Sequence, residues 1–434
     1  MKNKRFYFFC ALAFLLSTAA LSGIAQSQSI DTALAHQYFQ EAASICKRDG
    51  GKLWGVSLCL PMIFADHHTR MVVANQSDRE GNLTKEGEVF VGKLPERINI
   101  ANTAVEWAGV RWTMVVWPLP ENKYHRASLM LHESWHRIQN DLGFAGSGPA
   151  NDHLDLLEGR FLLQLEWRAL AKALTHRGAE RKQAIRDALI FRACRRSLFP
   201  NADVQERALE MHEGLAEYTG FRLSQHPDLD QYAADNLARG ERRKSFVRSF
   251  AYVSGPAYGI LLDGTGEDWR KGLKPTYDFG AMLQNALSIK LPEDIKQEAA
   301  RASHSYDGDA LRNRETERDN NRKRAIAEYR ARLVDGPVLA IPLRKMRMQF
   351  DPNNLQPFDS LGTVYPNIRI VDEWGILTVS KGALISPTFT QVTVSAPSDP
   401  AQPLEGDGWT LKLNAGWTIS SGERKGDYVL KENK

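Results

Sequence analysis

Apolar residues recur at helical spacing near the start of the chain and then give way to short apolar runs. Residues 31–48 place Leu34, Tyr38 and Ile45 on one face, which predicts an amphipathic helix. Four runs of apolar and β-branched residues follow, and they predict the strands of a small sheet. These runs are residues 53–63, 71–75, 89–91 and 112–117.

Helical periodicity dominates the middle of the chain. Residues 124–140 combine apolar and polar positions at helical spacing and predict a helix. Residues 153–198 are rich in Leu, Ala, Glu and Arg and predict a long helical region. A further helix is expected at residues 203–225, where Asp203 is a good N-cap, and mixed helices continue to about residue 332.

The pattern changes again after Asp335-Gly-Pro. Residues 311–332 form the last predicted helix, which is so highly charged that we expect it to be exposed. From residue 338 onward, short apolar and β-branched runs alternate with turn residues, as in an all-β domain. We therefore expect a helix-rich domain at residues 26–335 and a small β-rich domain at residues 336–434.

The first residues have the pattern of a secretory signal peptide. Three basic residues among the first five precede an apolar run, and the small residues Gly23 and Ala25 mark a cleavage position. Residues 1–25 are expected to be removed on export, which places the mature chain in the periplasm or outside the cell, without stable membrane insertion. The alternative is an uncleaved anchor, which the small and polar second half of the segment disfavours.

Composition becomes informative once this segment is set aside. The 434 residues carry 56 Lys and Arg against 52 Asp and Glu, a formal charge of +4. Removal of the signal peptide leaves 53 basic residues, so the mature chain is close to neutral. Its basic clusters lie among acidic residues without interleaved aromatic residues, which argues against a nucleic-acid-binding protein.

Export also changes what the cysteines are expected to do. Cys46 and Cys59 are close enough in sequence to pair in an oxidising compartment, which would leave Cys194 as the odd thiol. The apolar neighbours of Cys194 indicate a buried structural cysteine rather than a nucleophile.

One predicted helix carries the clearest chemical signal. His132 and His136 are four residues apart, so on a helix both imidazoles point the same way and can bind one metal ion. Glu133 adjoins the first histidine, where a carboxylate can take a proton from metal-bound water without being a ligand. This H-E-x-x-H arrangement is that of zinc peptidases; the alternative is an ordinary helix with two surface histidines.

A catalytic zinc site needs three protein ligands and an open position. The metzincin continuation is absent downstream of His136, so a glutamate is expected as the third ligand. Residues 212–218, His-Glu-Gly-Leu-Ala-Glu-Tyr, resemble the second zinc helix of the gluzincins, specifically the aminopeptidase-N-like group. The resemblance implies that Glu213 is the third ligand, that Glu217 orients a zinc histidine, and that small residues between them let the zinc helices pack closely.

The same resemblance implies a tyrosine and a strand at the site. Residues 250–258 are similar to the Tyr-x-x-Gly stretch whose phenol donates a hydrogen bond to the developing oxyanion in that group. Tyr252 is the candidate and Tyr258 the reserve, and a core aromatic residue is the alternative for either. In zincins the strand before the first zinc helix, here residues 112–117, usually presents an edge along which a substrate extends.

Departures from that group leave alternatives open. His136 and Glu213 are 77 positions apart, several times the usual spacing, so a helical insertion at about residues 150–200 is expected. Asp155 and Glu158 lie nearer the usual spacing and are rival ligands. The Gly-x-Met-Glu-Asn element of aminopeptidases is absent, so the resemblance does not imply exopeptidase specificity.

Three nearby residues carry weaker signals. Glu166 favours an ion pair with a neighbouring arginine over a ligand role. His153 is a weak candidate for the wall of the cleft. His212 stands where the family has Asn and could hold backbone or substrate.

These patterns predict an α+β protein with a zincin-like, mainly helical catalytic domain and a small edge sheet, followed by a small C-terminal β domain. The expected function is that of an exported zinc metallopeptidase, with Zn²⁺ held by His132, His136 and Glu213, and with Glu133 as general base. A peptide or protein is the expected substrate. The alternatives are a catalytically inactive zincin-fold binding protein and a zinc hydrolase acting on a non-peptide substrate.

Overall fold

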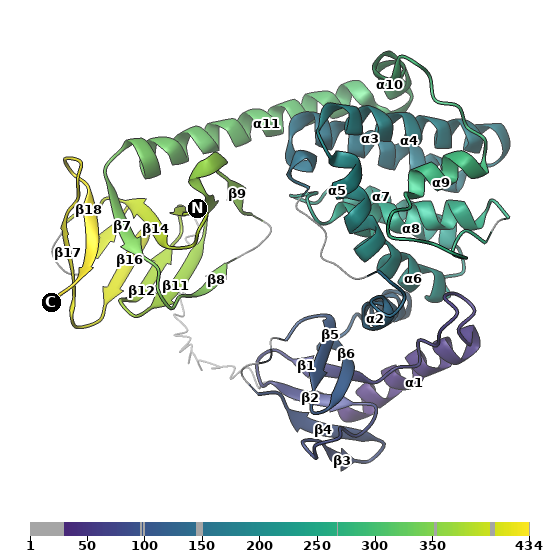
Figure 1. Ribbon diagram of the computed structural model, residues 1–434, viewed down its shortest axis with the longest axis horizontal. Coiled ribbons are helices and arrows are strands. Elements are labelled where there is room, and N and C mark those ends of the chain that lie inside the picture. Colours follow the sequence, from purple (N-terminus) through teal and green to yellow (C-terminus); the bar gives the residue numbers. More distant parts are fainter. Residues whose placement is uncertain are drawn as a thin grey trace, which may run out of the picture.

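The computed structural model describes residues 30–433 apart from 96–97, 99, 145–150, 267, 351–353 and 400–403. The predicted signal peptide lies outside the described residues. The described part mixes α and β structure, with an N-terminal sheet, a helical region and a C-terminal β region following one another along the chain (Figure 1). Within these ranges, none of the helices has the length and apolar character needed to cross a membrane.

The N-terminal region is a six-stranded sheet covered on one face by α1 (Thr32–Asp49). The Asp31 side chain caps this helix by accepting a hydrogen bond from the Leu34 amide, and Phe39 stacks on Phe64 of the sheet. The strand order is β3-β4-β2-β1-β6-β5. The strands are β1 (Met62–Asp66), β2 (Met71–Ala74), β3 (Thr84–Glu86), β4 (Val89–Lys93), β5 (Thr103–Trp107) and β6 (Val110–Trp117).

Two expectations about this sheet are wrong. Residues 53–61 form turns and loop rather than a strand, because Asp49 accepts hydrogen bonds from the Gly51 and Leu53 amides and turns the chain after α1. The strand that contains residues 112–117, β6, is not an edge, because it pairs with β1 on one side and β5 on the other. The edge beside α2 (Lys123–Ile138), the helix that carries His132 and His136, is therefore β5.

A disulfide joins the end of α1 to the loop before β1. Cys46 and Cys59 are paired, with their Cα atoms 5.3 Å apart, as their spacing allowed. Cys194 is free and buried, which confirms the expected structural cysteine.

The helical region begins with α2 (Lys123–Ile138), which packs on the sheet. The predicted helical region at residues 153–198 is a pair of helices, α3 (Leu157–Thr175) and α4 (Gly178–Leu198), that pack against each other. Residues 202–223 form a single helix, and its middle part, Glu210–Gly214, is a π-helical turn. The remaining bounds are α5 (Ala202–Leu209), η2 (Glu210–Gly214), α6 (Leu215–Leu223), α7 (Leu229–Gly240), α8 (Phe250–Asp263), α9 (Phe279–Ala286) and α10 (Ile295–Ser303).

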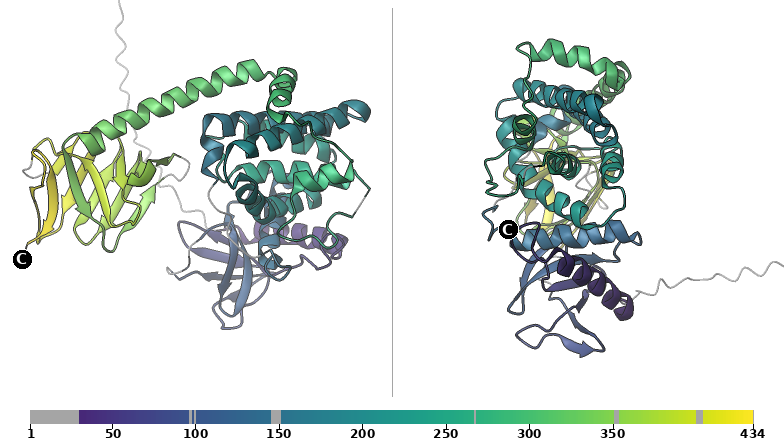
Figure 2. Two further views of the ribbon diagram at one scale, coloured as in Figure 1. Left: turned by 45° about the horizontal axis from the view of Figure 1, so that its top comes forward. Right: turned by 90° about the vertical axis from the view of Figure 1, so that its right-hand side faces the viewer.

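The C-terminal β region is reached through α11 (Gly308–Arg330), the long charged helix that spans the top of the molecule in Figure 1 and in the left view of Figure 2. Strand structure resumes at Val338. Two sheets, of order β17-β18-β7-β14-β13-β10-β9 and β15-β16-β12-β11-β8, enclose a separate core around Trp374. Their strands are β7 (Val338–Pro342), β8 (Arg347–Phe350), β9 (Gln356–Pro357), β10 (Thr363–Tyr365), β11 (Ile368–Asp372), β12 (Gly375–Val379), β13 (Ala383–Ile385), β14 (Gln391–Ser395), β15 (Leu404–Gly406), β16 (Trp409–Leu413), β17 (Trp417–Ser421) and β18 (Tyr428–Glu432).

Candidate metal centre

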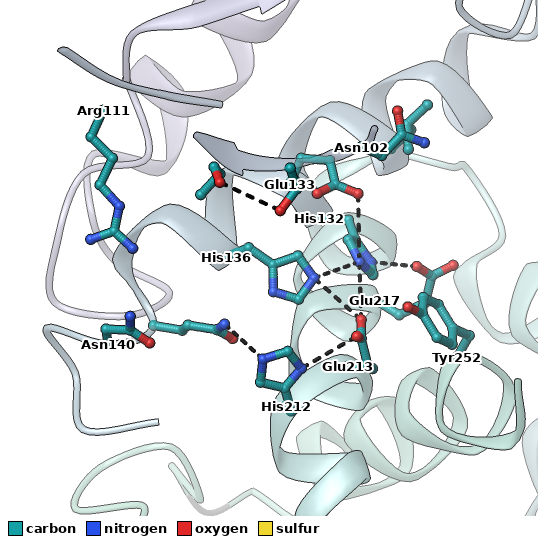
Figure 3. Close-up of a pocket in the computed structure, with 14 residues that line it drawn as sticks. Asn102, Arg111, His132, Glu133, His136, Asn140, His212, Glu213, Glu217 and Tyr252 are labelled. Carbon is teal, nitrogen blue, oxygen red and sulfur yellow. Dashed lines mark hydrogen bonds and ion pairs between the residues drawn. The ribbon is translucent and has the colours of Figure 1, made fainter. Parts of the chain in front are cut away.

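Three of the predicted metal ligands converge between α2 and the π-helical turn η2. The Nε2 atoms of His132 and His136 are 3.0 Å apart, and they lie 3.6 Å and 3.2 Å from Glu213 Oε2 (Figure 3). Ligand atoms on a tetrahedral zinc ion, each about 2.0–2.2 Å from the metal, are roughly 3.3 Å from one another. The observed separations bracket that value, so the three residues fit a zinc ion without rearrangement.

The hydrogen bonding of these residues also fits a cation. His132 Nδ1 lies 2.6 Å from Glu217 Oε2, a contact in which the imidazole donates, so the loss of the Nε2 proton leaves a lone pair on Nε2 for a cation. Glu213 Oε2 is buried and faces two imidazole nitrogens, His136 Nε2 at 3.2 Å and His132 Nε2 at 3.6 Å. A cation that accepts these lone pairs satisfies both groups, as buried polar atoms require.

The protonation of the site reflects its carboxylates. Burial lowers the pKa of His132, but hydrogen bonds to Glu213 and Glu217 outweigh it and raise the pKa to about 10. Burial acts to raise the pKa of Glu213, yet hydrogen bonds with His132, His136 and His212 hold it far below its usual range. A proton and a metal ion therefore compete for the same imidazole nitrogens and carboxylate oxygen, so metal binding should release a proton.

Glu133 lies beside the three ligands without being one of them. It is 4% exposed, and its Oε1 is 3.8 Å from His132 Nε2. Its Oε2 has no hydrogen-bond partner among the described residues. Burial raises the pKa of this carboxyl group, which makes it a better proton acceptor than an exposed glutamate. It lines a cavity of about 580 Å³ together with the three ligands.

Tyr252 of α8 closes the site on the side of His132. Its ring stacks on the His132 imidazole, with centroids 5.5 Å apart and planes 10° apart, and it lines the same cavity. Burial, together with the charge of Glu213, raises the pKa of Tyr252, so the phenol keeps its proton and can donate it in a hydrogen bond. Tyr258, the reserve candidate, is wrong for this role, because it is fully buried and donates to Glu166 at 2.7 Å.

Glycines allow close contacts among the three helices of the site, α2, α6 and α8. These contacts are not the ones that the sequence motif around Glu213 predicted. A Cβ on Gly255 of α8 would lie 2.4 Å from the Cα of Gly214, so this contact seats Tyr252 against Glu213. Gly214 thus packs on α8 rather than on α2. The close approach of α2 to α6 is made by Gly220, where a Cβ would lie 2.4 Å from the Ser128 carbonyl oxygen.

The rival ligands are engaged elsewhere. Asp155 accepts a hydrogen bond from the Phe246 amide and pairs with Arg160, and Glu158 pairs with Arg312 of α11. Neither lines the cavity. Among the described residues, the one group of His, Cys, Asp and Glu that could hold a metal ion is His132, His136 and Glu213.

The weaker candidates divide between the cavity and the core. His212 lines the cavity, 3.0 Å from the Gln139 side chain. His153 does not line it but contacts Glu206 at 2.9 Å. Glu166 forms the expected ion pairs, with Arg192 and Arg195 of α4.

Several residues that line the cavity were not predicted from the sequence. Asn102 and the first two residues of the edge strand β5, Thr103 and Ala104, line the cavity, as do Arg111 and Asn140. Figure 3 shows Arg111 and Asn140 across the site from Asn102. None of these belongs to a motif, and the half-buried, weakly apolar β5 gives little strand signal. A search for polar residues next to the strand before the first zinc helix is the one signal that would have found Arg111.

Comparison of the chain with protein-family models, with curated proteins and with solved structures finds no match. The chemistry of the site therefore has to be inferred from its own residues and distances.

Proposed function

We propose that this protein is a zinc-dependent peptidase with a zincin-like arrangement of the gluzincin type. The observation that carries the proposal is the convergence of His132, His136 and Glu213 beside a buried glutamate, Glu133, with an oxygen free of hydrogen bonds. A site that only stabilises the fold has no use for such a glutamate, since an unpartnered buried carboxylate is costly.

His132, His136 and Glu213 would hold the ion, and Glu217 would fix the orientation of the His132 ring through Nδ1. When bound, the ion supplies Lewis-acid polarisation of the scissile carbonyl and lowers the pKa of a coordinated water. The three residues line a cavity of about 580 Å³, which would give a substrate room beside the ion.

Glu133 would take a proton from the attacking water and return it to the leaving amine. Its position beside the ligands and its raised pKa suit both steps. Tyr252 would donate a hydrogen bond to the oxygen that becomes negatively charged in the transition state. The stacking of its ring on His132 and the close contact between Gly214 and Gly255 would hold the phenol in place.

The edge strand β5 supports the proposed binding of a peptide, and the disulfide supports the proposed export. β5 borders the cavity with one edge unpaired, so an extended peptide could add to the sheet there. The Cys46–Cys59 bond suits an oxidising compartment, in line with export to the periplasm or the medium.

The test is cleavage of a mixed peptide library by the zinc-loaded protein, followed by mass spectrometry. We expect Glu133→Gln to bind as much zinc as the unaltered protein and to cleave about 10²- to 10⁴-fold more slowly. Glu317→Gln, on the exposed face of α11, is the matched control and should cleave normally. Undiminished cleavage by Glu133→Gln would overturn the mechanism.

A further inference from the structure

Acidic and basic side chains are unevenly distributed around the cavity at the candidate metal centre. Glu133, Glu213 and Glu217 line its centre, and Arg111 is the one lysine or arginine among the described residues that line it. Figure 3 shows Arg111 on the His136 side of the site, with Asn140 on that same side and Tyr252 on the opposite side. A divalent ion at the centre would offset two of the three glutamate charges and leave no net positive charge there, whereas Arg111 would attract a negatively charged part of a substrate to its end of the cavity.

The backbone of Arg111 is fixed relative to the metal ligands. Arg111 belongs to β6, and its carbonyl oxygen accepts a hydrogen bond of 2.6 Å from Nε of Arg137. Arg137 directly follows His136 on α2, so this contact ties the strand to the helix that carries two ligands. The Arg111 side chain starts from a defined position beside the site.

The guanidinium of Arg111 is available to a ligand. Its one ion-pair partner in the described part of the chain is Glu106, directly opposite on β5, at 3.7 Å. Glu106 is 73% exposed on its side chain, so the pair is screened by water and weak. An incoming carboxylate can replace Glu106 and gain a bidentate hydrogen bond to the guanidinium.

Another cation near the site, Arg248, does not line the cavity. It lies 3.6 Å from Glu213 Oε1, and its side chain is 61% exposed. Arg248 thus faces a carboxylate of the protein itself.

We propose that Arg111 is a specificity-determining residue that binds a carboxylate of the substrate, close to the scissile bond. The inference rests on the proposed peptidase function and names its substrate class, peptides with a carboxylate at the His136 side of the site. That carboxylate belongs either to an Asp or Glu side chain or to the C terminus of the peptide.

The test compares matched peptides that differ by Glu or Gln at each position around the cleaved bond, each with a free or an amidated C terminus. We expect the unaltered protein to prefer one carboxylate-bearing form by about 10-fold in kcat/KM. Arg111→Gln should abolish this preference while still cleaving the neutral peptides, and Arg111→Lys should keep part of it. Loss of the preference on amidation identifies the C terminus as its source, and loss on Glu-to-Gln replacement identifies a side chain.

Arg301→Gln, at a position whose side chain is 74% exposed on α10, is the control and should keep the preference. Cleavage without any preference, or a preference that survives in Arg111→Gln, would overturn the inference while leaving the peptidase proposal standing.

If the protein cleaves no peptide, the peptidase proposal fails and Arg111 is tested by binding. The affinity of fluorescently labelled acidic and neutral peptides for Glu133→Gln, with and without Arg111→Gln, is then measured by anisotropy. If the double variant binds the acidic peptide more weakly than Glu133→Gln does, while the neutral peptide binds both equally, the role of Arg111 is supported. If both variants bind the acidic peptide equally, that role is contradicted.

Discussion

Two pairs of glutamates on one continuous helix have opposite surroundings. Glu206 and Glu210 are fully buried and face arginines of α4, whereas Glu213 and Glu217 face the histidines of α2. In an uninterrupted α-helix all four would lie along one stripe. The π-helical turn Glu210–Gly214 adds a residue to one turn and rotates the later pair relative to the earlier one.

On the side of this helix that faces α4, here called the arginine side, both oxygens of Glu206 and both oxygens of Glu210 accept hydrogen bonds from arginines. Arg195 donates to Glu206 at 2.8 Å and to Glu166 at 2.5 Å, and Arg192 donates to both oxygens of Glu210. On the side that faces the histidines of α2, here called the histidine side, Glu133 Oε2 has no hydrogen-bond partner in the described part of the chain, and Glu213 Oε2 faces the imidazoles of His132 and His136. A buried carboxylate that is fully paired with arginine holds the fold together, and one left without such a partner indicates a site that binds something else.

The largest expected effect comes from breaking the paired side. Arg195→Met should lower the free energy of unfolding by about 3–5 kcal/mol, because it leaves the charges of Glu166 and Glu206 undercompensated. Glu213→Gln in metal-free protein should cost far less. Denaturant unfolding of both variants measures the difference, and a small effect of Arg195→Met would remove the contrast between the two sides.

A second variant probes the histidine side without touching a ligand. Glu217→Ala should weaken zinc binding about 10- to 100-fold, because His132 loses the acceptor that orients its ring. The metal-free protein should also lose some stability, because the hydrogen bond with Glu217 is one of the interactions that raise the pKa of buried His132. Competition with a zinc chelator gives the affinity, and unchanged affinity would show that Glu217 does not brace the site.

The packing that joins the site to α8 gives a third prediction. Gly255→Ala should cost about 1–3 kcal/mol, because its Cβ would meet the backbone of Gly214 at 2.4 Å. It should also lower cleavage by moving Tyr252 relative to Glu213. Gly264→Ala, at the end of α8, is the control, since its Cβ would meet the flexible end of the Arg181 side chain. Equal costs for the two variants would show that the Gly214–Gly255 contact is not tight.

The ligand set was largely predictable from the sequence because its information is local. The spacing of His132 and His136 fixes their common face, and the motif around Glu213 is a short contiguous string. The helix at residues 124–140 and three of the six strands of the first sheet, β2, β4 and β6, are confirmed for the same reason. Periodicity within one segment is enough to recognise each of them.

What the sequence did not reveal depends on which elements are neighbours. The pattern of residues 112–117 predicts a strand but not its position between β1 and β5, so the edge strand was missed. The pairing of Glu166 with α4 and the contact of Gly214 with Gly255 likewise depend on tertiary packing. The π-helical turn has no signal in local propensity, yet it decides which face Glu213 presents.

The smallest expected effect is on acid stability. Burial acts to raise the pKa of Asp278, but Arg192 and Arg196 outweigh it and hold the pKa below its ordinary value of 3.8. Because the folded-state pKa is lowered, Asp278 stabilises the fold above pH 3.8, and this contribution is lost as the pH falls toward the folded-state pKa. Unfolding of the metal-free protein should therefore depend less on pH below 3.8 in Asp278→Asn, which keeps the N-cap of α9. An identical pH dependence would contradict the pairing.

The central claim, that the histidine side of this helix is a metal site, is tested most directly by counting bound metal. Zinc per chain should be measured after dialysis for the unaltered protein, for Glu213→Gln and for Glu158→Gln, the rival ligand that pairs with Arg312. We predict one ion per chain for the unaltered protein and for Glu158→Gln, and loss of the ion in Glu213→Gln. Full occupancy in Glu213→Gln, or no zinc in the unaltered protein, would contradict the account.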